Sequence, residues 1–260
     1  MTDETSHAQR LQLALDAARE AGRITLRYFR RDDLKVERKT DDSPVTAADR
    51  AAEDEIVAII RRTFPDHAIL GEEGGARGSG DVRWIVDPID GTRGFARGGI
   101  MWGPMIALEV EKQLVAGAFA LPAQNVTYWA ARGRGAFRDG TQIAVSGITE
   151  LDDATLSVGE LRRMTKVGGF QRLVDRAAST RCYGDVAGCA LVLDGRAEAW
   201  IEGGVQPWDL AAPAIIIAEA GGRFTDWGGA PTFEHGHGIA SNGRFHDELV
   251  RAMGGNPTGR

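Results

Sequence analysis

The sequence predicts a layered protein whose first half is α+β and whose second half is α/β. Amphipathic segments open the chain, apolar strand-like runs separated by short turns follow them, and short strand and helix patterns alternate after about residue 148. The 260 residues are 43% hydrophobic and 26% charged, a globular composition with enough chain for a large core. We therefore expect a half over residues 1–148 and a half over residues 149–260, packed as one unit.

Two helices are predicted before the first strand of the main sheet. Small or apolar side chains recur from Leu11 to Phe29 at three- to four-residue spacing, which is typical of an amphipathic helix. The segment from Ser43 to Thr46 indicates the start of a second helix, with Thr46 as its N-cap, and Phe64-Pro65-Asp66 ends it. Each helix has one apolar face that a sheet can cover.

The strands of the first half bring acidic residues to their ends. Ala68 to Gly71 is a short predicted strand that leads into Glu72 and Glu73 and then into a glycine-rich loop through Gly80. The next strand runs from Arg83 to Val86. Three further apolar runs predict a mostly antiparallel sheet, over residues 100–111, 114–121 and 126–131.

The second half alternates between the two patterns. We expect strands over residues 154–158, 181–183, 197–201 and 222–226, and helices over residues 169–178, 186–193 and 209–220. Such alternation is typical of an α/β layer.

Charge and composition exclude several partners. The formal net charge of −6 offers no long-range attraction for nucleic acid or an anionic membrane. The polar N-terminus does not have the pattern of a signal peptide, and no apolar run approaches the roughly 20 residues of a membrane span. We therefore expect a cytoplasmic protein that binds neither nucleic acid nor membrane. Cys182 and Cys189 are expected to be two buried thiols, and His235-Gly236-His237 to be an exposed loop.

The stretch from Trp84 to Thr92 is the most informative part of the chain. An apolar strand ends at Asp87 and Asp90, and Gly91 and Thr92 follow at the start of a helix. Asp-Pro and Asp-Gly alone would be ordinary turn dipeptides. Glu72-Glu73 and Asp209 also follow a strand or begin a helix, so the acids together predict an all-oxygen site for Mg²⁺ or Mn²⁺.

These residue types suit metal-assisted phosphoryl chemistry. A phosphate ester can be held between two such ions while one ion lowers the pKa of a bound water molecule. Gly91 allows the N–H groups at the start of the helix to approach phosphate oxygens closely, and Thr92 adds a hydroxyl there.

Motifs along the whole chain resemble the Mg²⁺-dependent, lithium-sensitive inositol monophosphatase-like phosphatases. They are Pro44-Val45-Thr46-Ala47-Ala48-Asp49, Gly71-Glu72-Glu73, Trp84 to Thr92, and Pro207-Trp208-Asp209 followed by Glu219-Ala220-Gly221-Gly222. The resemblance implies the sugar-phosphatase fold, an αβαβα layered sandwich that is commonly a homodimer. It also implies a phosphomonoesterase that uses two or three Mg²⁺ ions, or alternatively Mn²⁺, on a small phosphorylated metabolite.

The resemblance further implies a role for each acidic residue. The first metal would be held by Glu72, Asp87 and the carbonyl of Ile89, and the second by Asp87, Asp90 and Asp209, with Glu72 reaching a weaker third.

The catalytic and phosphate-binding residues follow from the same resemblance. Thr92, hydrogen-bonded to Asp49, would orient the attacking water and help to deprotonate it, with Glu72 also counted as catalytic. Judged without the resemblance, Asp49 is a first-turn helix acid stabilised by the helix dipole. The phosphate would contact Asp90, Gly91 and Thr92.

The leaving group is expected to contact the second half of the chain. Implied substrate-binding residues are Arg181, Gly184, Asp185, Glu202 and Asp209. Asp185 matches the acid that histidinol-phosphate phosphatases of this family have at this position, and a carboxylate there suits a cationic leaving group. The alternative is that Asp185 only caps the helix toward Leu193. The sequence departs from the family pattern at Arg93 and Gly94, and from that subfamily in the segments 99–103 and 186–189.

The expected function is a Mg²⁺-dependent phosphomonoesterase that hydrolyses L-histidinol phosphate in histidine biosynthesis. An inositol-1-phosphate phosphatase is the first alternative, ahead of a phosphatase for fructose 1,6-bisphosphate or adenosine 3′,5′-bisphosphate. A non-catalytic binding or regulatory protein on the same fold is the alternative from a different class.

Overall fold

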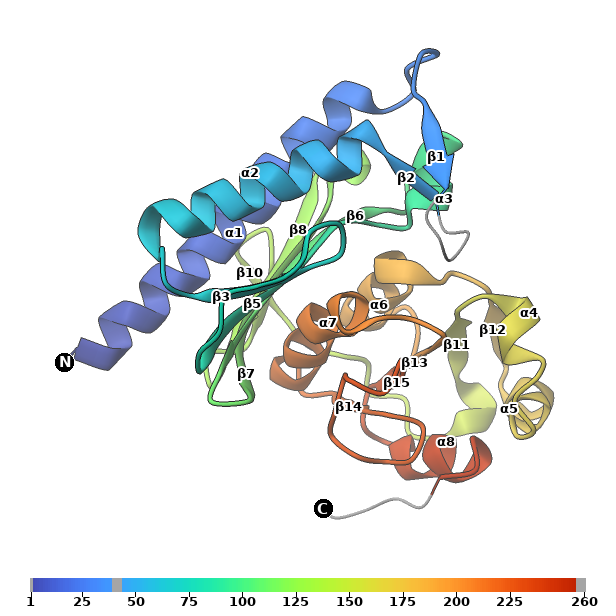
Figure 1. Cartoon of the computed structure of the whole chain (residues 1–260). Helices are drawn as coiled ribbons and strands as arrows, with labels where there is room; N and C mark the ends of the chain where they lie inside the picture. The colour runs from blue at the N-terminus through green and yellow to red at the C-terminus, as the bar shows by residue number, and fades with distance from the viewer. Residues whose placement is uncertain (1, 39–43, 256–260) are drawn as a thin grey trace.

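The chain folds into five alternating layers of helix and sheet (Figure 1). The computed structural model describes residues 2–38 and 44–255. Helices α1 and α2 cover one face of an eight-stranded sheet, α6 and α7 lie between this sheet and a five-stranded sheet, and α5 and α8 pack on the outer face of the second sheet. This is the αβαβα sandwich that the sequence predicts.

The outer helix layer forms where the apolar stripes indicate it. α1 spans Thr2–Tyr28, so it begins well before Leu11, and α2 spans Ala47–Thr63. Thr46 is the N-cap of α2: its hydroxyl accepts the N–H of Ala48, and its own N–H donates to Asp49. Ser43, placed at the predicted start of this helix, lies outside the described residues. Alanines of α1 and the isoleucines of α2 are buried against the large sheet.

The large sheet is mostly antiparallel, with the one exception that β3 and β5 run parallel. Its order is β10-β9-β8-β7-β6-β5-β3-β4. The strands are β3 Ala68–Gly71, β4 Gly75–Arg77, β5 Val82–Asp90, β6 Gly103–Val110, β7 Gln113–Leu121, β8 Val126–Ala131, β9 Ala136–Arg138 and β10 Thr141–Ile143.

Several short elements of the first half are not predicted from the sequence. The hairpin of β1 Val36–Arg38 and β2 Pro44–Thr46 precedes α2, and β4 lies inside the segment that we expected to be a glycine-rich loop. β5 extends to Asp90, so both predicted metal-binding aspartates are part of the strand. The short helices α3 Thr92–Ala96 and η1 Pro122–Gln124 complete this half.

The second sheet has the order β12-β11-β13-β15-β14, with β11 parallel to β12 and β13. Its strands are β11 Thr155–Val158, β12 Ser179–Arg181, β13 Ala199–Gly203, β14 Arg223–Thr225 and β15 His237–Ser241. The helices of this half are η2 Leu151–Asp153, α4 Leu161–Met164, α5 Phe170–Arg176, α6 Asp185–Leu193, α7 Pro207–Glu219 and α8 His246–Ala252. The division of the chain at residue 148 into two halves stays a prediction.

Two expectations for the second half are wrong in part. Cys189 is buried as expected, but Cys182 is exposed. His235 lies in an exposed bend, as expected. His237 does not lie in an exposed loop but begins β15, where its ring stacks on Trp227 with ring centroids 4.6 Å apart. His235 Nδ1 lies 2.7 Å from the Asp226 carboxylate. The exposed surroundings were inferred from neighbouring Gly and Pro residues, whereas the antiparallel pairing of β13 with β15 decides the burial.

The central helix layer is apolar on all sides because both sheets cover it. Side chains of α6 and α7 pack between Ile85 and Phe119 of the large sheet and Trp200 of the second sheet. A Cβ on Gly117 would overlap Ile215, so this glycine lets α7 approach β7 closely. Within the described ranges, no helix combines the length and apolarity that crossing a membrane requires.

Candidate active site

The acidic motifs meet at one end of β5. Because β3 and β5 are parallel and Gly71 is in register with Val86, the residues that follow these two positions, Glu72 and Asp87, lie next to each other. The N–H of Glu72 donates to the Val86 carbonyl at 3.1 Å and continues the pairing by one residue. The start of α7 brings Asp209 to the same place. The structure therefore joins three chain segments that the sequence only suggested could meet.

Three aspartates form a compact cluster. Asp87, Asp90 and Asp209 each offer a carboxylate oxygen, and these oxygens lie within 4.8 Å of one another. Asp87 accepts the N–H of Ile89 at 2.9 Å, and Asp209 accepts the N–H of Gln206 at 2.7 Å. These hydrogen bonds from backbone N–H groups fix the orientation of the Asp87 and Asp209 carboxylates.

Electrostatics of this cluster favour a bound cation. Burial raises the pKa of Asp87, and the charges of Glu72, Asp90 and Asp209 raise it further. Burial also raises the pKa of Asp90, with Asp185 and Asp209 as the largest charged contributors. A group of buried carboxylates that repel one another fits a hard divalent cation with oxygen ligands, since such an ion neutralises the shared negative charge.

Thr92 and Asp49 form a pair beside the cluster. The Thr92 hydroxyl lies 3.1 Å from Asp49 Oδ1 and 2.9 Å from the carbonyl of Ile89, and its single proton serves one of the two acceptors at a time. Asp49 Oδ2 accepts both the N–H and the hydroxyl of Thr46. Burial raises the pKa of Asp49 to about 6. A carboxylate with its pKa near neutrality, hydrogen-bonded to a hydroxyl, can accept and release a proton.

Gly91 has a backbone conformation that other residues rarely adopt. Its φ is +84°, and it occupies the N-cap position of α3. A Cβ at Gly91 would lie 2.9 Å from the carbonyl oxygen of Met101 and 3.2 Å from Asp185 Oδ2. Glycine is therefore required both by the turn and by the close approach of the loop that carries Asp185.

The beginning of α6 connects the cluster to the second half of the chain. The N–H of Val186 donates to Asp90 Oδ2, and the N–H of Asp185 donates to Glu202 Oε1 at 3.0 Å. Gly184, not Asp185, occupies the N-cap position, so the alternative in which Asp185 only caps this helix is not supported. Surrounding protein atoms raise the pKa of Asp185, although the residue remains exposed, and the charge of Arg93 opposes this shift.

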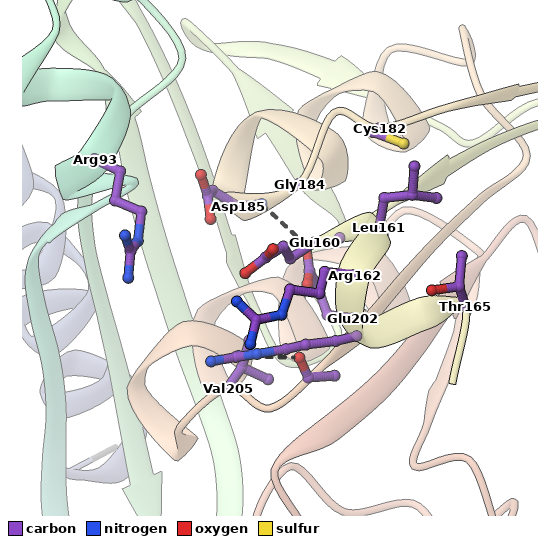
Figure 2. A pocket seen from close by; sticks show the side chains of 13 residues that line it. Arg93, Glu160, Leu161, Arg162, Thr165, Cys182, Gly184, Asp185, Glu202 and Val205 are labelled. Atoms are coloured by element: carbon purple, nitrogen blue, oxygen red, sulfur yellow. Dashed lines mark hydrogen bonds between the residues drawn. The ribbon is translucent and has the colours of Figure 1, made fainter. Parts of the chain in front are cut away.

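A cavity of about 830 Å³ lies next to Asp185 and reaches α4 (Figure 2). Gly184, Asp185 and Glu202 line it, as do Arg93, Glu160 and Arg162. Arg181 is not part of the lining: it is exposed, and its guanidinium donates to the carbonyl of Thr180 at 3.0 Å.

Glu202 differs from the other carboxylates of the cavity. It is only 4% exposed, and its Oε1 atom also accepts the indole N–H of Trp200 at 3.1 Å. Burial raises the pKa of Glu202 to about 8, and the nearby charge of Asp185 contributes.

One residue that positions the site was not identified from the sequence. Glu53 of α2 is 1% exposed and accepts the N–H groups of Glu73 at 2.7 Å and Gly74 at 2.8 Å, so it holds the loop that carries Glu72. A Cβ on Gly71 would lie 2.6 Å from the Glu53 carboxylate. The available indication was a glutamate on the apolar face of an amphipathic helix, where an unpaired charge is rare.

Comparison with known proteins gives one family. The model of the inositol monophosphatase family matches residues 7–256. A histidinol-phosphatase of Chlorobaculum parvum is 42% identical over 249 residues, which cover 94% of this chain and 96% of that protein. A Nus factor SuhB of Pseudomonas aeruginosa is 38% identical over 257 residues, with 94% of this chain and 95% of that protein covered.

Solved structures agree with this result. A structure of a Thermotoga maritima IMPase superimposes with a TM-score of 0.87 at 35% identity. The match covers 95% of this chain and 97% of the other. All of these matches extend over nearly the full length, so they include both sheets and the acidic cluster.

Proposed function

Since the chain belongs to the inositol monophosphatase family and is a phosphatase, we propose that it hydrolyses L-histidinol phosphate to L-histidinol and phosphate, using Mg²⁺. In this reaction a water oxygen forms the new bond to phosphorus, the bond between phosphorus and the leaving oxygen breaks, and that oxygen receives a proton. The observation that carries the choice of substrate is the carboxylate of Asp185, which borders both the acidic cluster and the cavity.

The metal ligands in this proposal are the acidic residues at the end of β5 and their neighbours. Glu72, Asp87 and the carbonyl of Ile89 would hold one ion, Asp87, Asp90 and Asp209 would hold a second, and Glu72 would take part in a weaker third site. The spacing of 4.8 Å or less among the three aspartates supports the shared position of Asp87. Bound Mg²⁺, or alternatively Mn²⁺, would supply charge neutralisation and a water molecule of lowered pKa.

The protein itself contributes a proton acceptor and a phosphate-binding turn. Thr92 accepts a hydrogen bond from the attacking water while its own proton is directed toward Asp49, 3.1 Å away. Asp90, Gly91 and Thr92 surround the phosphate, and the φ of +84° at Gly91 shapes that turn. Glu72 completes the catalytic set through its place beside Asp87.

The leaving group extends from this turn into the cavity. Asp185 accepts a hydrogen bond from the ammonium group of histidinol, and a charge-assisted bond of this kind is worth about 1.5–3 kcal/mol. Gly184, Glu202 and Asp209 complete the surroundings of the leaving group. Arg181 lies outside the cavity lining, at the exposed end of β12. Its predicted contact with substrate therefore requires a leaving group that extends out of the cavity to this strand end.

A substrate panel tests this proposal. Purified protein is assayed with Mg²⁺ on L-histidinol phosphate, myo-inositol 1-phosphate and fructose 1,6-bisphosphate, and kcat/KM is compared. We expect L-histidinol phosphate to have the highest value and EDTA to abolish phosphate release. A tenfold or greater preference for myo-inositol 1-phosphate would overturn the substrate and leave the phosphatase activity in place.

A role as a binding protein is the alternative that the SuhB relative raises. Calorimetric titration with Mg²⁺ of the wild type and of Asp90→Asn separates the two classes. We expect strong binding to the wild type and much weaker binding to the variant. A protein that works only as a scaffold would show little metal binding in either form.

A further inference from the structure

The carboxylates that line the cavity are not equally available to a ligand. Glu202 Oε1 accepts two N–H groups, and Glu202 Oε2 packs so closely on Gly159 that a Cβ there would overlap it. Gly184 also packs against this carboxylate. Glu202 therefore holds together the segments that carry residues 159–160 and 184–185, and it has little surface left for a substrate.

Glu160 has the opposite surroundings. It lies at the N-cap position of α4, is exposed, and lines the cavity. Among the residues that the structure describes, its carboxylate has no hydrogen bond or ion pair. Figure 2 shows its side chain turned into the cavity on the side from which Asp185 also projects.

The position of Glu160 is fixed by its neighbours. The N–H of Gly159 donates to the Ile201 carbonyl at 2.9 Å, which anchors the preceding residue to β13. Arg163, one turn further, donates to the carbonyls of Gly203 and Gly204, so α4 is tied to the end of β13. The guanidinium of Arg163 therefore donates to backbone carbonyls rather than to Glu160. The Glu160 carboxylate stays available to bind a cationic or hydrogen-bond-donating ligand in the cavity.

The two available carboxylates come from different elements, and contacts with the phosphate turn are found for Asp185. The charge of Asp185 acts on Asp90, and its Oδ2 lies 3.2 Å from the Cβ position of Gly91, so it borders the phosphate turn. Glu160 is the N-cap residue of α4 and lines the same cavity from that helix. In histidinol phosphate the ammonium group lies close to the ester oxygen, while the imidazole ring is further along the chain.

We propose that Glu160 binds the imidazole ring of the leaving group, while Asp185 binds its ammonium group. The inference rests on the proposed function, because it requires a leaving group with a second nitrogen-bearing end. Glu160 is thus a substrate-binding residue that selects for this ring, and Glu202 is a positioning residue that acts through the backbone of Asp185.

The test compares two substrates that share an ammonium group and differ in the ring. The full-length protein with Mg²⁺ is assayed at pH 7 on L-histidinol phosphate and on O-phosphoethanolamine, which lacks the imidazole. We expect Glu160→Gln to lower the ratio of the two kcat/KM values about tenfold, a change of about 1.4 kcal/mol, mainly through KM for L-histidinol phosphate. Arg162→Gln, which removes a positive charge from the same helix, is not expected to lower that ratio.

The matched control is Glu111→Gln, which removes an equal charge at the opposite end of the large sheet. Val110 of β6 pairs with Val82, whereas Gly103 of the same strand pairs with Asp90, so the turn at Glu111 is remote from the site. An unchanged ratio in Glu160→Gln, with a wild type that hydrolyses L-histidinol phosphate, overturns this inference alone. Equal losses for both substrates also overturn it, because they place Glu160 at the ammonium group. A wild type that prefers myo-inositol 1-phosphate overturns the proposed function and the inference together.

Discussion

Replacing Asp87 by Asn should separate stability from activity at the acidic cluster. The change keeps the shape of the side chain and its acceptor for the N–H of Ile89, but it removes one of the mutually repelling charges. In metal-free protein this removal relieves repulsion and should stabilise the fold. Under the proposed metal ligation, the same removal would take a shared ligand from two Mg²⁺ ions and should abolish turnover.

The size of the effect follows from the spacing of the carboxylates. Two unit charges 4.8 Å apart repel by about 3.5 kcal/mol at an effective dielectric constant of about 20. The raised pKa of Asp87 indicates that proton uptake already relieves part of this repulsion in the wild type. We therefore expect a gain of roughly 1–2 kcal/mol in unfolding free energy, which is about 3–6 °C in Tm for a chain of this size.

Thermal unfolding in EDTA and in Mg²⁺ measures both parts. In EDTA the Tm of Asp87→Asn should exceed that of the wild type; added Mg²⁺ should raise the Tm of the wild type and leave the variant nearly unchanged. Its kcat should fall at least 100-fold, about 2.7 kcal/mol of barrier. Retention of more than a tenth of kcat, or an equal response of both proteins to Mg²⁺, would refute the shared position of Asp87. Glu111→Gln is the control for loss of one negative charge.

Two further predictions concern groups outside the metal ligands. Burial lowers the pKa of His246 from about 6.5 to about 4. Between these two pH values His246 is protonated in the unfolded chain and neutral in the folded chain. The contribution of His246 to the unfolding free energy is at its full value above pH 6.5 and falls by roughly 3 kcal/mol as the pH drops toward 4. In urea unfolding, the unfolding free energy of His246→Asn should therefore fall less steeply with decreasing pH than that of the wild type. Glu53→Ala leaves the N–H groups of Glu73 and Gly74 without their acceptor, which costs about 1–3 kcal/mol, and releases Glu72. Mg²⁺ titration should then show weaker binding, with partial rescue in Glu53→Gln, and unchanged affinity in both would contradict the positioning role of Glu53.

The elements that sequence patterns predicted best are those whose cause is local. The N-terminus of α2 forms where Thr46 and Asp49 satisfy free N–H groups, and β3, β7 and β8 are found within one or two residues of the apolar runs. Strands of three residues such as β1, β4, β9 and β10 were missed because they are too short for periodicity and form only through pairing with a neighbour. The helices α4 and α8 and the five-residue strand β15 were also missed.

The sequence indicated that the acidic residues form one site, because each of them follows a predicted strand or begins a predicted helix, and the family resemblance implied which of them share an ion. Their adjacency follows from strand register, which the structure gives. Once β3 and β5 are parallel and in register, Glu72 and Asp87 must be adjacent, and Asp90 follows on the same strand. The orientation of Thr92 toward Asp49 required the resemblance to a family, because 43 residues separate them. The hydrogen bonds from Glu73 and Gly74 to Glu53 could be identified only from the structure, because the sequence does not show which loop a buried glutamate contacts.

The cavity beside Asp185, which the proposed function assigns to the leaving group, is formed by tertiary packing alone. It is therefore harder to predict from the sequence than the acidic cluster at the end of β5. Gly159 and Gly184 look like ordinary turn glycines in the sequence, yet each is needed because the Glu202 carboxylate occupies the space of its Cβ. The wall that contains Glu160 exists only because these segments converge on Glu202. Under the role proposed for Glu160, we expect a substitution there to alter the leaving group that is accepted without moving the carboxylates at the end of β5.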